Sequence, residues 1–515
     1  MVAELTSRTK KSAHNSIVAI IYYLIGLILQ FFSRKIFLEY LGTEILGLNT
    51  TAQNMLQFLN LAELGIGTAV SFTLYKPIHD NDAETVNEIV TLQGHLYKRI
   101  GVAVIIGACI LMGCFPWIFK KMELPLWYAF ASFGTLLLSA VLGYFVNYKQ
   151  IILSASQKNY KILYSYRSVI LVKIVLQMFA VWLLPHGYVW WLILEGLFAI
   201  LASWSLHRAT MKEYPTLKSV DLAYGVLKDK FHGIVTKIKQ VFFHKVGGFA
   251  LTQLAPLIIY AIIDLNEVTL YGNYILISTG IISMMSAVFN SMDASVGNLV
   301  AEGDPVKVRN IFKEIFSIRY VMAATLCFAV LMFASPFISV WIGDEYLLPY
   351  STLVLIVINL YVQLTRYTTE TFIAAFGLYS DIWSPVVETV LNLGCSIVLG
   401  LKFGLNGIIA GVVISQIVVI VLWKPFFLIT REMKGFMKTY IMIYIGHLAL
   451  GFLSGWLCWI LLRQFLDGAF NGYFDLFACG TSFSIVYAII LVSLLCVFFK
   501  QMRGALIRIW KLISR

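Results

Sequence analysis

Residues 17–32 read IVAIIYYLIGLILQFF, and this stretch decides the fold because runs like it recur to the far end of the chain. A second example is LNGIIAGVVISQIVVIVL at residues 405–422. A helix that rises about 1.5 Å per residue needs roughly 20 apolar residues to cross a hydrocarbon layer of about 30 Å. A soluble core does not need such repetition. The sequence therefore predicts a protein whose helices span a membrane many times.

The bulk composition supports the same class. Of the 515 residues, 59% are hydrophobic and 13% are charged, about half the charged share of an ordinary soluble chain. A short basic leader with Arg8, Lys10 and Lys11 precedes the first apolar run, as in a secretory signal. The run lacks a small-residue cleavage site, so we expect a retained first helix.

The apolar runs predict an all-α polytopic membrane protein with about fourteen transmembrane helices. No stretch between them is long enough for a soluble domain that would carry the function. The expected spans are residues 16–38, 45–74, 96–119, 125–148, 162–184, 188–210, 241–263, 268–299, 319–342, 348–376, 381–401, 405–427, 439–462 and 476–499.

The distribution of lysine and arginine predicts the orientation. With the N-terminus inside and fourteen crossings, the inner segments take about thirty of the 39 basic residues, as the positive-inside rule requires. The basic stretch 500–515 then also lies inside, so both termini are expected in the cytoplasm. The net charge of +12 is mostly a topology signal with some attraction to anionic lipids, and nucleic-acid binding is not needed to explain it.

The longest polar stretch divides the chain. We expect an N-terminal lobe of six helices at residues 1–211, a cytoplasmic linker at 212–240, a second six-helix lobe at 241–430, and two further helices with a basic tail at 431–515. Residues 82–89 (DAETVNEI) and 304–311 (DPVKVRNI) match at Asp, Val and Ile, 222 positions apart. This offset keeps both lobes in the same orientation, which predicts parallel repeats as in transporters.

The seven cysteines show no metal-ligand spacing, and the eight histidines form no ligand set. The prediction is therefore a protein without a metal or another cofactor.

Four short motifs in residues 34–77 carry a resemblance to a known family. They are RKIFLEYLG at 34–42, LGLN at 46–49, LAELGIG at 61–67 and LYKP at 74–77. The block resembles the polysaccharide repeat-unit flippases, the capsule and O-antigen exporters of the multidrug/oligosaccharidyl-lipid/polysaccharide superfamily. Helix number and the two-lobe organisation agree with this family over the whole chain.

The resemblance implies a V-shaped, MATE-like bundle in the bacterial inner membrane that serves capsule, O-antigen or lipopolysaccharide synthesis. Its cargo would be an undecaprenyl-diphosphate-linked oligosaccharide that passes from the inner to the outer leaflet by alternating access. The expected partners are this lipid-linked oligosaccharide, membrane lipids, a coupling proton or sodium ion, and the glycosyltransferases and polymerase of the same route. Related lipid flippases suggest that the last two spans supply a groove for the lipid tail.

Charged side chains inside spans are costly, so each is a candidate site residue. Three cations would offset the diphosphate charge in the cavity: Arg366, Lys173 and Arg34. Each has a structural alternative. Arg366 could pair with Glu370 four residues later, Lys173 with an acid such as Glu195, and Arg34 could be an interfacial anchor.

Four acidic residues are candidates for binding a coupling ion, and the alternative for each is a pair with a neighbouring base. They are Glu63, Asp293, Glu370 and Glu388.

Amide side chains follow one face of the predicted second span. Amides donate and accept hydrogen bonds together, which suits sugar hydroxyls, although interhelical hydrogen bonds are the alternative. The stripe consists of Asn49, Gln53, Gln57 and Asn60.

Rival functions predict other features. A membrane glycosyltransferase or polymerase would need acidic residues on a large outer loop, and the outer loops here are short, so we do not expect an enzyme. A multidrug or cation-coupled exporter of the same superfamily would need an acid-rich, apolar cavity, whereas the amides, Arg366 and Lys173 favour an anionic, hydroxylated cargo. Nothing specific supports a receptor or scaffold.

Overall fold

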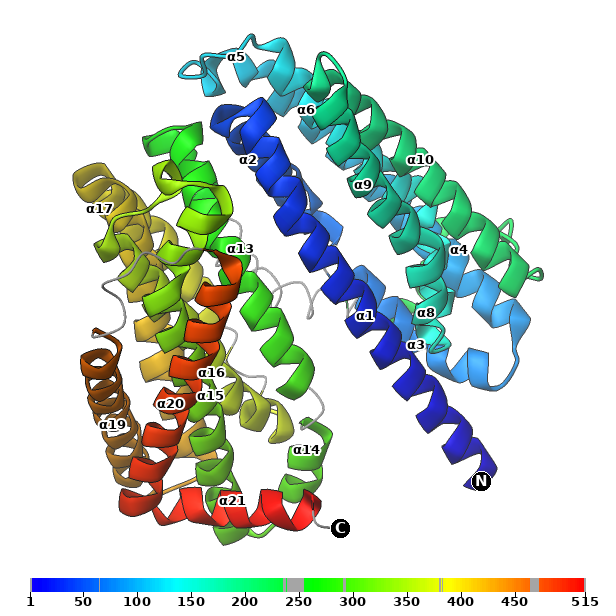
Figure 1. Ribbon diagram of the computed structural model, residues 1–515. Coiled ribbons are helices and arrows are strands. Elements are labelled where there is room, and N and C mark those ends of the chain that lie inside the picture. The colour runs from blue at the N-terminus through cyan, green and yellow to red at the C-terminus, as the bar shows by residue number, and fades with distance from the viewer. Residues whose placement is uncertain are drawn as a thin grey trace. The chain divides into compact units, whose positions relative to one another are not determined.

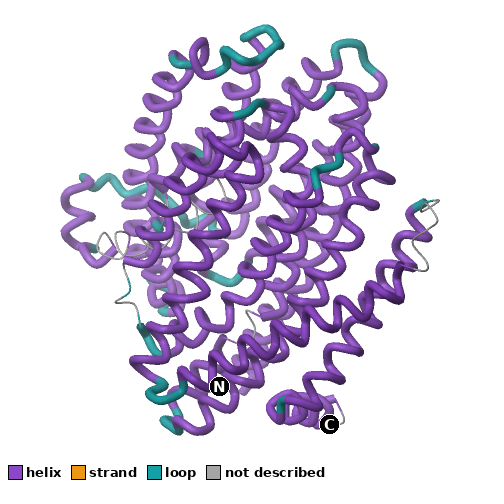
Figure 2. The backbone as a smooth tube through the Cα atoms, turned by 90° about the vertical axis from the view of Figure 1, so that its left-hand side faces the viewer, coloured by secondary structure: helices purple, strands orange, loops and turns teal. Residues whose placement is uncertain are grey.

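The computed structural model describes residues 2–63, 65–234, 254–289, 293–378, 383–463 and 472–513, together with residues 238 and 381. Within these ranges every regular element is a helix and no strand occurs. Figure 1 shows the helices as long rods, and Figure 2 shows short loops at their ends. The expected all-α polytopic fold is confirmed.

Ten helical segments of the described residues are long and apolar enough to cross a membrane. Their relation to the fourteen expected spans is simple. The expected spans 381–401 and 405–427 together form one of the ten segments, Trp383–Glu432. Residues 241–253 lie outside the described residues, residues 45–74 form a broken helix, and polar residues such as Arg366 lower the mean hydropathy of 348–376.

The chain divides into two compact units, Met1–Thr269 and Leu270–Arg515. In the first unit the helix pairs in most extensive contact are α9 with α10, α1 with α9, and α6 with α10. Its helices are α1 (Val2–Leu41), α2 (Thr43–Leu59), η1 (Asn60–Glu63), α3 (Ile66–His79), α4 (Ala83–Gly113), α5 (Phe115–Ile118), α6 (Trp127–Phe145), η2 (Asn147–Gln150), α7 (Ile151–Ala155), α8 (Asn159–Ile162), the π-helical η3 (Leu163–Arg167), α9 (Ser168–Leu183), α10 (Gly187–Glu213) and α11 (Tyr224–Lys230).

The second unit is built around a central helix, α15, which packs against α16, α20 and α21. Helix α13 begins at the end of the first unit. The helices are α13 (Leu265–Phe289), α14 (Asp293–Ala301), α15 (Pro305–Ile342), η5 (Asp344–Tyr346), α16 (Tyr350–Ala375), α17 (Trp383–Gln416), the π-helical η6 (Ile417–Trp423), α18 (Lys424–Glu432), α19 (Met437–Arg463), α20 (Tyr473–Phe498) and α21 (Lys500–Ile513).

The predicted second span, residues 45–74, is not one helix. Helix α2 ends at Leu59, a 3₁₀ turn follows, and α3 starts at Ile66 after Gly65. Gly65 has a φ of 99°, in the left-handed region that glycine enters without a Cβ penalty. The break turns polar side chains of this region toward a pocket, as described below.

Helix α17 contains a sharp turn that separates two antiparallel segments. Gly404 adopts φ 58° and ψ −136°, so the boundary between the two expected spans, 381–401 and 405–427, is a real break. Beyond it the segments are in close contact, because a Cβ on Gly411 would lie 2.3 Å from the backbone nitrogen of Ser396.

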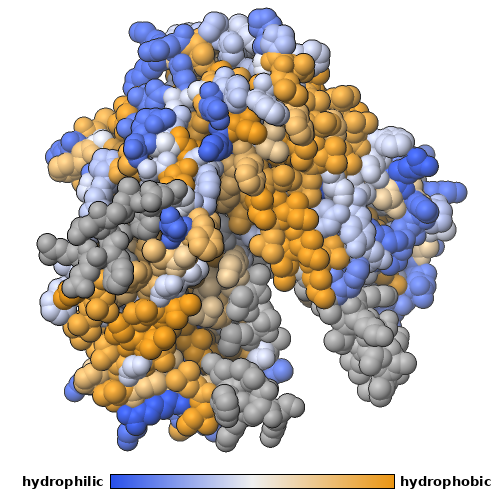
Figure 3. Space-filling model, in the orientation of Figure 1, coloured by the Kyte–Doolittle hydropathy of each residue, from blue (hydrophilic) through white to orange (hydrophobic). Residues whose placement is uncertain are grey.

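The outer surface of the helices is apolar. Large hydrophobic side chains are exposed along them, for example Phe452, Ile110 and Leu401, and Figure 3 shows broad hydrophobic areas on the visible face. A soluble protein rarely exposes such contiguous apolar surface. It is the surface expected of helices surrounded by lipid.

The polar stretch after α10 packs onto the first unit. Leu217, Leu227 and Ile234 are buried in a cluster with residues of α3 and α4. Lys230 donates hydrogen bonds to both oxygens of the buried Glu88 at 2.6 and 2.7 Å. The described part of this segment is therefore anchored to the bundle.

Candidate functional site

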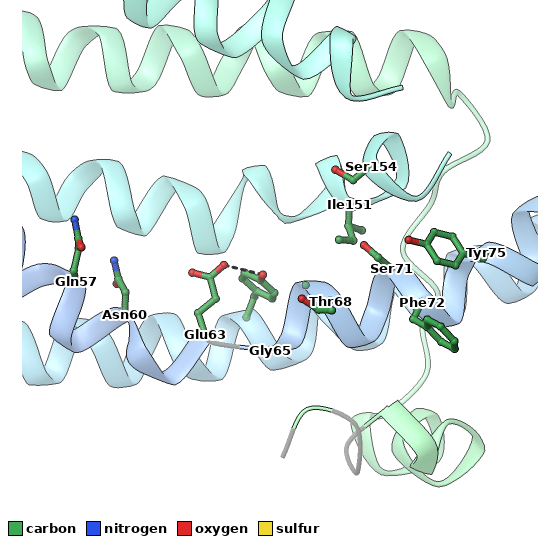
Figure 4. A pocket seen from close by; sticks show the side chains of 12 residues that line it. Gln57, Asn60, Glu63, Gly65, Thr68, Ser71, Phe72, Tyr75, Ile151 and Ser154 are labelled. Carbon is green, nitrogen blue, oxygen red and sulfur yellow. Dashed lines mark hydrogen bonds between the residues drawn. The ribbon is translucent and has the colours of Figure 1, made fainter. Parts of the chain in front are cut away.

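A pocket of about 650 Å³ lies at the break between α2 and α3 in the first unit. Figure 4 shows side chains from α2, η1, α3 and the α7 region around it. Three residues predicted from the sequence line it: Gln57, Asn60 and Glu63. The other lining residues are Gly65, Gly67, Thr68, Ser71, Phe72, Tyr75, Tyr97, Ile151 and Ser154.

Two tyrosines hold the polar side chains of this pocket in place. The Tyr97 hydroxyl donates to Glu63 Oε1 at 2.9 Å, and the Tyr144 hydroxyl donates to Asn60 Oδ1 at 2.8 Å. Among the described residues, the Gln57 amide and the Asn60 amide nitrogen form no hydrogen bond, so they can bind another partner. A volume of this size is typical of small-molecule sites, and mixed donors and acceptors beside aromatic rings suit a sugar.

The predicted amide stripe is divided. Asn49 is buried, and its Oδ1 accepts hydrogen bonds from Ser132 Oγ and, at 3.1 Å, from the Tyr188 hydroxyl. These are the interhelical hydrogen bonds of the structural alternative. Gln53 is exposed on α2 and does not line the pocket. Only the two amides next to the helix break, Gln57 and Asn60, reach it.

Lys173 on α9 forms a buried ion pair with Glu195 on α10. The distance from Nζ to Oε1 is 2.5 Å, and the two side chains are 11% and 12% exposed. Gln177 donates from Nε2 to Glu195 Oε2 at 2.9 Å and to the Trp191 carbonyl oxygen at 3.1 Å. The structural partner expected for Lys173 is present, and contact with a substrate stays a prediction.

Arg34 lies near the C-terminal end of α1. Its Nη2 donates to the Thr269 carbonyl oxygen at 3.2 Å. Close by, the Thr43 carbonyl accepts a hydrogen bond of 2.8 Å from Thr269 Oγ1. Arg34 therefore fixes the first helix to the start of α13, and a role toward a diphosphate stays a prediction.

The second unit contains a partly buried charge cluster between α16 and α18. Arg366 Nη2 lies 2.9 Å from Glu370 Oε1, which confirms the expected intrahelical pair. Lys424, at the start of α18, donates to the same oxygen at 2.5 Å. One carboxylate thus serves two cations, so the trio carries a net charge of +1. The sequence analysis placed Lys424 inside the expected span 405–427 but did not identify it as a site residue.

Glu388 faces the same region from α17, which packs against α16. It is 3% exposed, and its charge interacts with those of Arg366, Lys424 and Glu370. Within the described ranges its Oε1 atom has no hydrogen-bond partner, and neither does the amide of Asn392 one turn later. Unsatisfied buried polar atoms of this kind are costly and often mark function. The side chain of Asp293, at the start of α14, lies outside the described residues.

An almost wholly apolar groove of about 1120 Å³ runs between the α17–α18 region and α19. Its lining residues directly adjoin the charge cluster along the chain, since Val387 precedes Glu388 and Trp423 precedes Lys424. The complete lining is Trp383, Ser384, Val387, Val418, Val419, Val421, Leu422, Trp423, Pro425, Phe426, Met437, Tyr440, Ile441, Tyr444 and Ile445.

Comparison with known proteins shows similarity at the level of structure. No family model and no curated protein sequence matches the chain. The lipid II flippase MurJ in an inward closed conformation superimposes with a TM-score of 0.67, at 13% identity over 94% of this chain and 98% of MurJ.

Two states of a multidrug resistance MATE transporter of the MOP superfamily are also similar. The inward-facing structure has a TM-score of 0.59 at 15% identity, over 82% of this chain and 99% of the transporter. The outward-facing structure has a TM-score of 0.57 at 16% identity, over 83% and 97%. The chain therefore has the helical fold shared by MATE transporters and the flippase MurJ.

Proposed function

We propose that this protein is a flippase that moves lipid-linked oligosaccharide repeat units across the bacterial cytoplasmic membrane by alternating access. The cargo would be an undecaprenyl-diphosphate-linked glycan that is used for a surface polysaccharide such as capsule or O-antigen. Both termini would lie in the cytoplasm, as the distribution of basic residues predicts.

The observation that carries this proposal is that α17 and α18, which hold Glu388 and Lys424 of the charge cluster, also line the apolar groove. A lipid diphosphate is an anion attached to a long apolar chain. Arg366 and Lys424 supply two cations that share one carboxylate, and residues next in sequence to this cluster line the groove. Arginine and lysine are the usual phosphate binders, the former through a planar fork of donors. The groove would take the polyprenyl tail.

The pocket of the first unit supports a carbohydrate cargo. Gln57 and Asn60 bring amide groups, and Glu63 brings a carboxylate, into a space that serines and tyrosines also line. Such side chains match the alternating donors and acceptors of sugar hydroxyls. Tyr75 and Phe72 add aromatic surface against which an apolar sugar face can pack.

The extent of the structural likeness supports a flippase over a drug exporter. MurJ matches 94% of this chain, whereas the MATE transporters match 82% and 83%. This difference in coverage is expected if the chain has two helices beyond a twelve-helix core, because a twelve-helix transporter has no counterpart for them. A coupling proton or sodium ion would bind at one of the acids named above, among which Glu388 has an unpartnered oxygen.

The proposal can be tested in a strain that lacks the gene. We expect surface glycan to be lost and to be restored by the wild-type protein. At equal protein levels, the variants Arg366→Ala and Lys424→Ala should each restore at least tenfold less surface glycan than the wild type does. Lys438→Ala, which changes an exposed lysine of α19, is the matched control and should restore it fully. Normal glycan with both cluster variants would refute the assigned cation site.

The alternative is a multidrug or cation exporter, which the MATE likeness and the acid Glu63 in the first pocket favour. The same strain separates the two functions. A deletion that leaves the surface glycan intact and lowers only drug tolerance would establish the exporter and refute the flippase.

A further inference from the structure

The last helix, α21, runs crosswise to α20 at one end of the second unit (Figure 1). It packs against both α15 and α20. Met502 and Ala505 are buried and hold it there, whereas Leu506 and Ile507 are 38% and 56% exposed. A helix with one face on the protein and apolar side chains exposed beside basic ones is typical of the membrane interface.

A pocket of about 500 Å³ lies between α21 and the beginning of α15. Four basic and two acidic side chains line it, so its net charge is +2. These residues are Lys307, Lys313, Lys500 and Arg508 together with Asp304 and Glu314. The remaining lining residues are Val306, Asn310, Ile311, Gln501 and Gly504.

Both acids already have partners in the protein. Asp304 caps α15, because its Oδ1 accepts from the backbone N–H groups of Val306 at 2.9 Å and Lys307 at 3.1 Å. Glu314 Oε2 lies 3.1 Å from Arg508 Nε. Lys307 pairs with Glu302, outside the pocket lining. The acids therefore leave two other lysines of the pocket without a counter-charge.

Those lysines are Lys313 and Lys500, and neither forms an ion pair with any residue in the described part of the chain. Gln501 adds a third donor, since its Nε2 is buried and lacks an acceptor among the described residues. Two ammonium groups without a counter-charge and an unpaired amide N–H around one space favour the binding of an anionic acceptor.

We propose that this pocket binds the phosphate head group of an anionic phospholipid. The acyl chains would lie along the exposed Leu506 and Ile507 of α21 and Val306 of α15. Helices α15 and α20 are candidate membrane spans, so a site at their ends has lipid head groups as its neighbours. The cytoplasmic leaflet, where the basic C-terminal segment is expected, is the one rich in anionic lipid in many membranes. This site is independent of the identity of the transported glycan.

Native mass spectrometry of the full-length protein in detergent measures this binding directly. The probes are phosphatidylglycerol and phosphatidylcholine of the same chain length. We expect the wild type to retain phosphatidylglycerol preferentially. Lys313→Gln with Lys500→Gln should weaken that binding about fivefold for each lysine. Lys434→Gln with Lys438→Gln, which removes the same charge from exposed lysines outside the pocket, should leave it unchanged.

Competition by glycerol 1-phosphate tells a lipid site from a site for a soluble phosphate. Millimolar glycerol 1-phosphate should not displace the lipid, because it lacks the acyl chains. Equal retention of the two lipids, equal loss in the control pair, or complete displacement by glycerol 1-phosphate would each overturn the proposal. Unfolding temperatures of all variants verify that they fold.

Discussion

At the scale of single residues, the position of a charged side chain along its membrane span predicted whether it needs a partner. Lys173 lies too far from either end of its helix for its stem to reach the interface easily, and Glu195 was an expected partner, which the structure confirms. Lys424 was not predicted as a site residue, because it lies near the end of the expected span 405–427, where a lysine can reach the interface. Its ion pair with Glu370 depends on how α18 packs against α16, and a linear pattern does not contain that information.

The buried pair gives a prediction for stability. Lys173→Met should lower the free energy of unfolding by about 3–5 kcal/mol, because it leaves the Glu195 carboxylate buried with only Gln177 and no cation. Lys173→Met with Glu195→Gln should recover most of this loss. Thermal unfolding in detergent measures both. A single variant as stable as the wild type would show that water reaches the carboxylate.

The same double variant separates structure from substrate contact. If Lys173 only pairs with Glu195, the double variant should export glycan normally. If Lys173 binds the diphosphate, export should fall although the protein remains stable.

Glu388 gives the opposite prediction. Glu388→Met keeps a similar side-chain volume and removes a buried carboxylate with an unpartnered oxygen. The free energy of unfolding should therefore rise by about 1–3 kcal/mol. Transport should decrease, since groups that destabilise a fold are often retained for function. Unfolding temperature and surface glycan at equal expression are the two measurements. A less stable variant would mean that the carboxylate stabilises the fold.

At the scale of helices, apolar runs located the spans but not their internal breaks. The turn at Gly404 follows from the sequence, because Lys402 ends one apolar run and Leu405 starts the next. The break at Gly65 does not follow, because hydropathy reports apolarity and not helical hydrogen bonding. The two glycines near it, Gly65 and Gly67, together with the polar Glu63, were a usable signal. Helical spacing also could not show that Asn49 hydrogen-bonds to side chains of α6 and α10, so the expected amide stripe is divided within α2.

The close packing after Gly404 predicts a steric effect. Gly411→Ala would place its Cβ 2.3 Å from the Ser396 backbone nitrogen, so the two segments of α17 must separate. Overpacking of this kind typically costs about 1–3 kcal/mol. Gly394→Ala is the matched control on the same helix, because no atom lies within 4 Å of its added Cβ. We expect a lower unfolding temperature only for Gly411→Ala, and equal values would contradict the packing described here.

At the scale of the whole molecule, composition and charge were sufficient for the class of fold. Apolar runs and the sorting of 39 basic residues predicted a helical membrane protein, which the structure confirms. The candidate site was predicted only in part. Gln57, Asn60 and Glu63 do line one pocket, but the groove beside the charge cluster arises from the packing of three separate helices, and no local pattern predicts it.

Translocation by the purified protein tests the central claim most directly. Proteoliposomes would carry a fluorescent undecaprenyl-diphosphate-linked oligosaccharide, and a membrane-impermeant glycosidase would report which leaflet holds it. We predict that the wild type exposes cargo from the inner leaflet at least tenfold faster than protein-free vesicles, and that Arg366→Ala with Lys424→Ala abolishes the difference. No acceleration by the wild type, in vesicles that do extrude a cationic dye, would contradict the account.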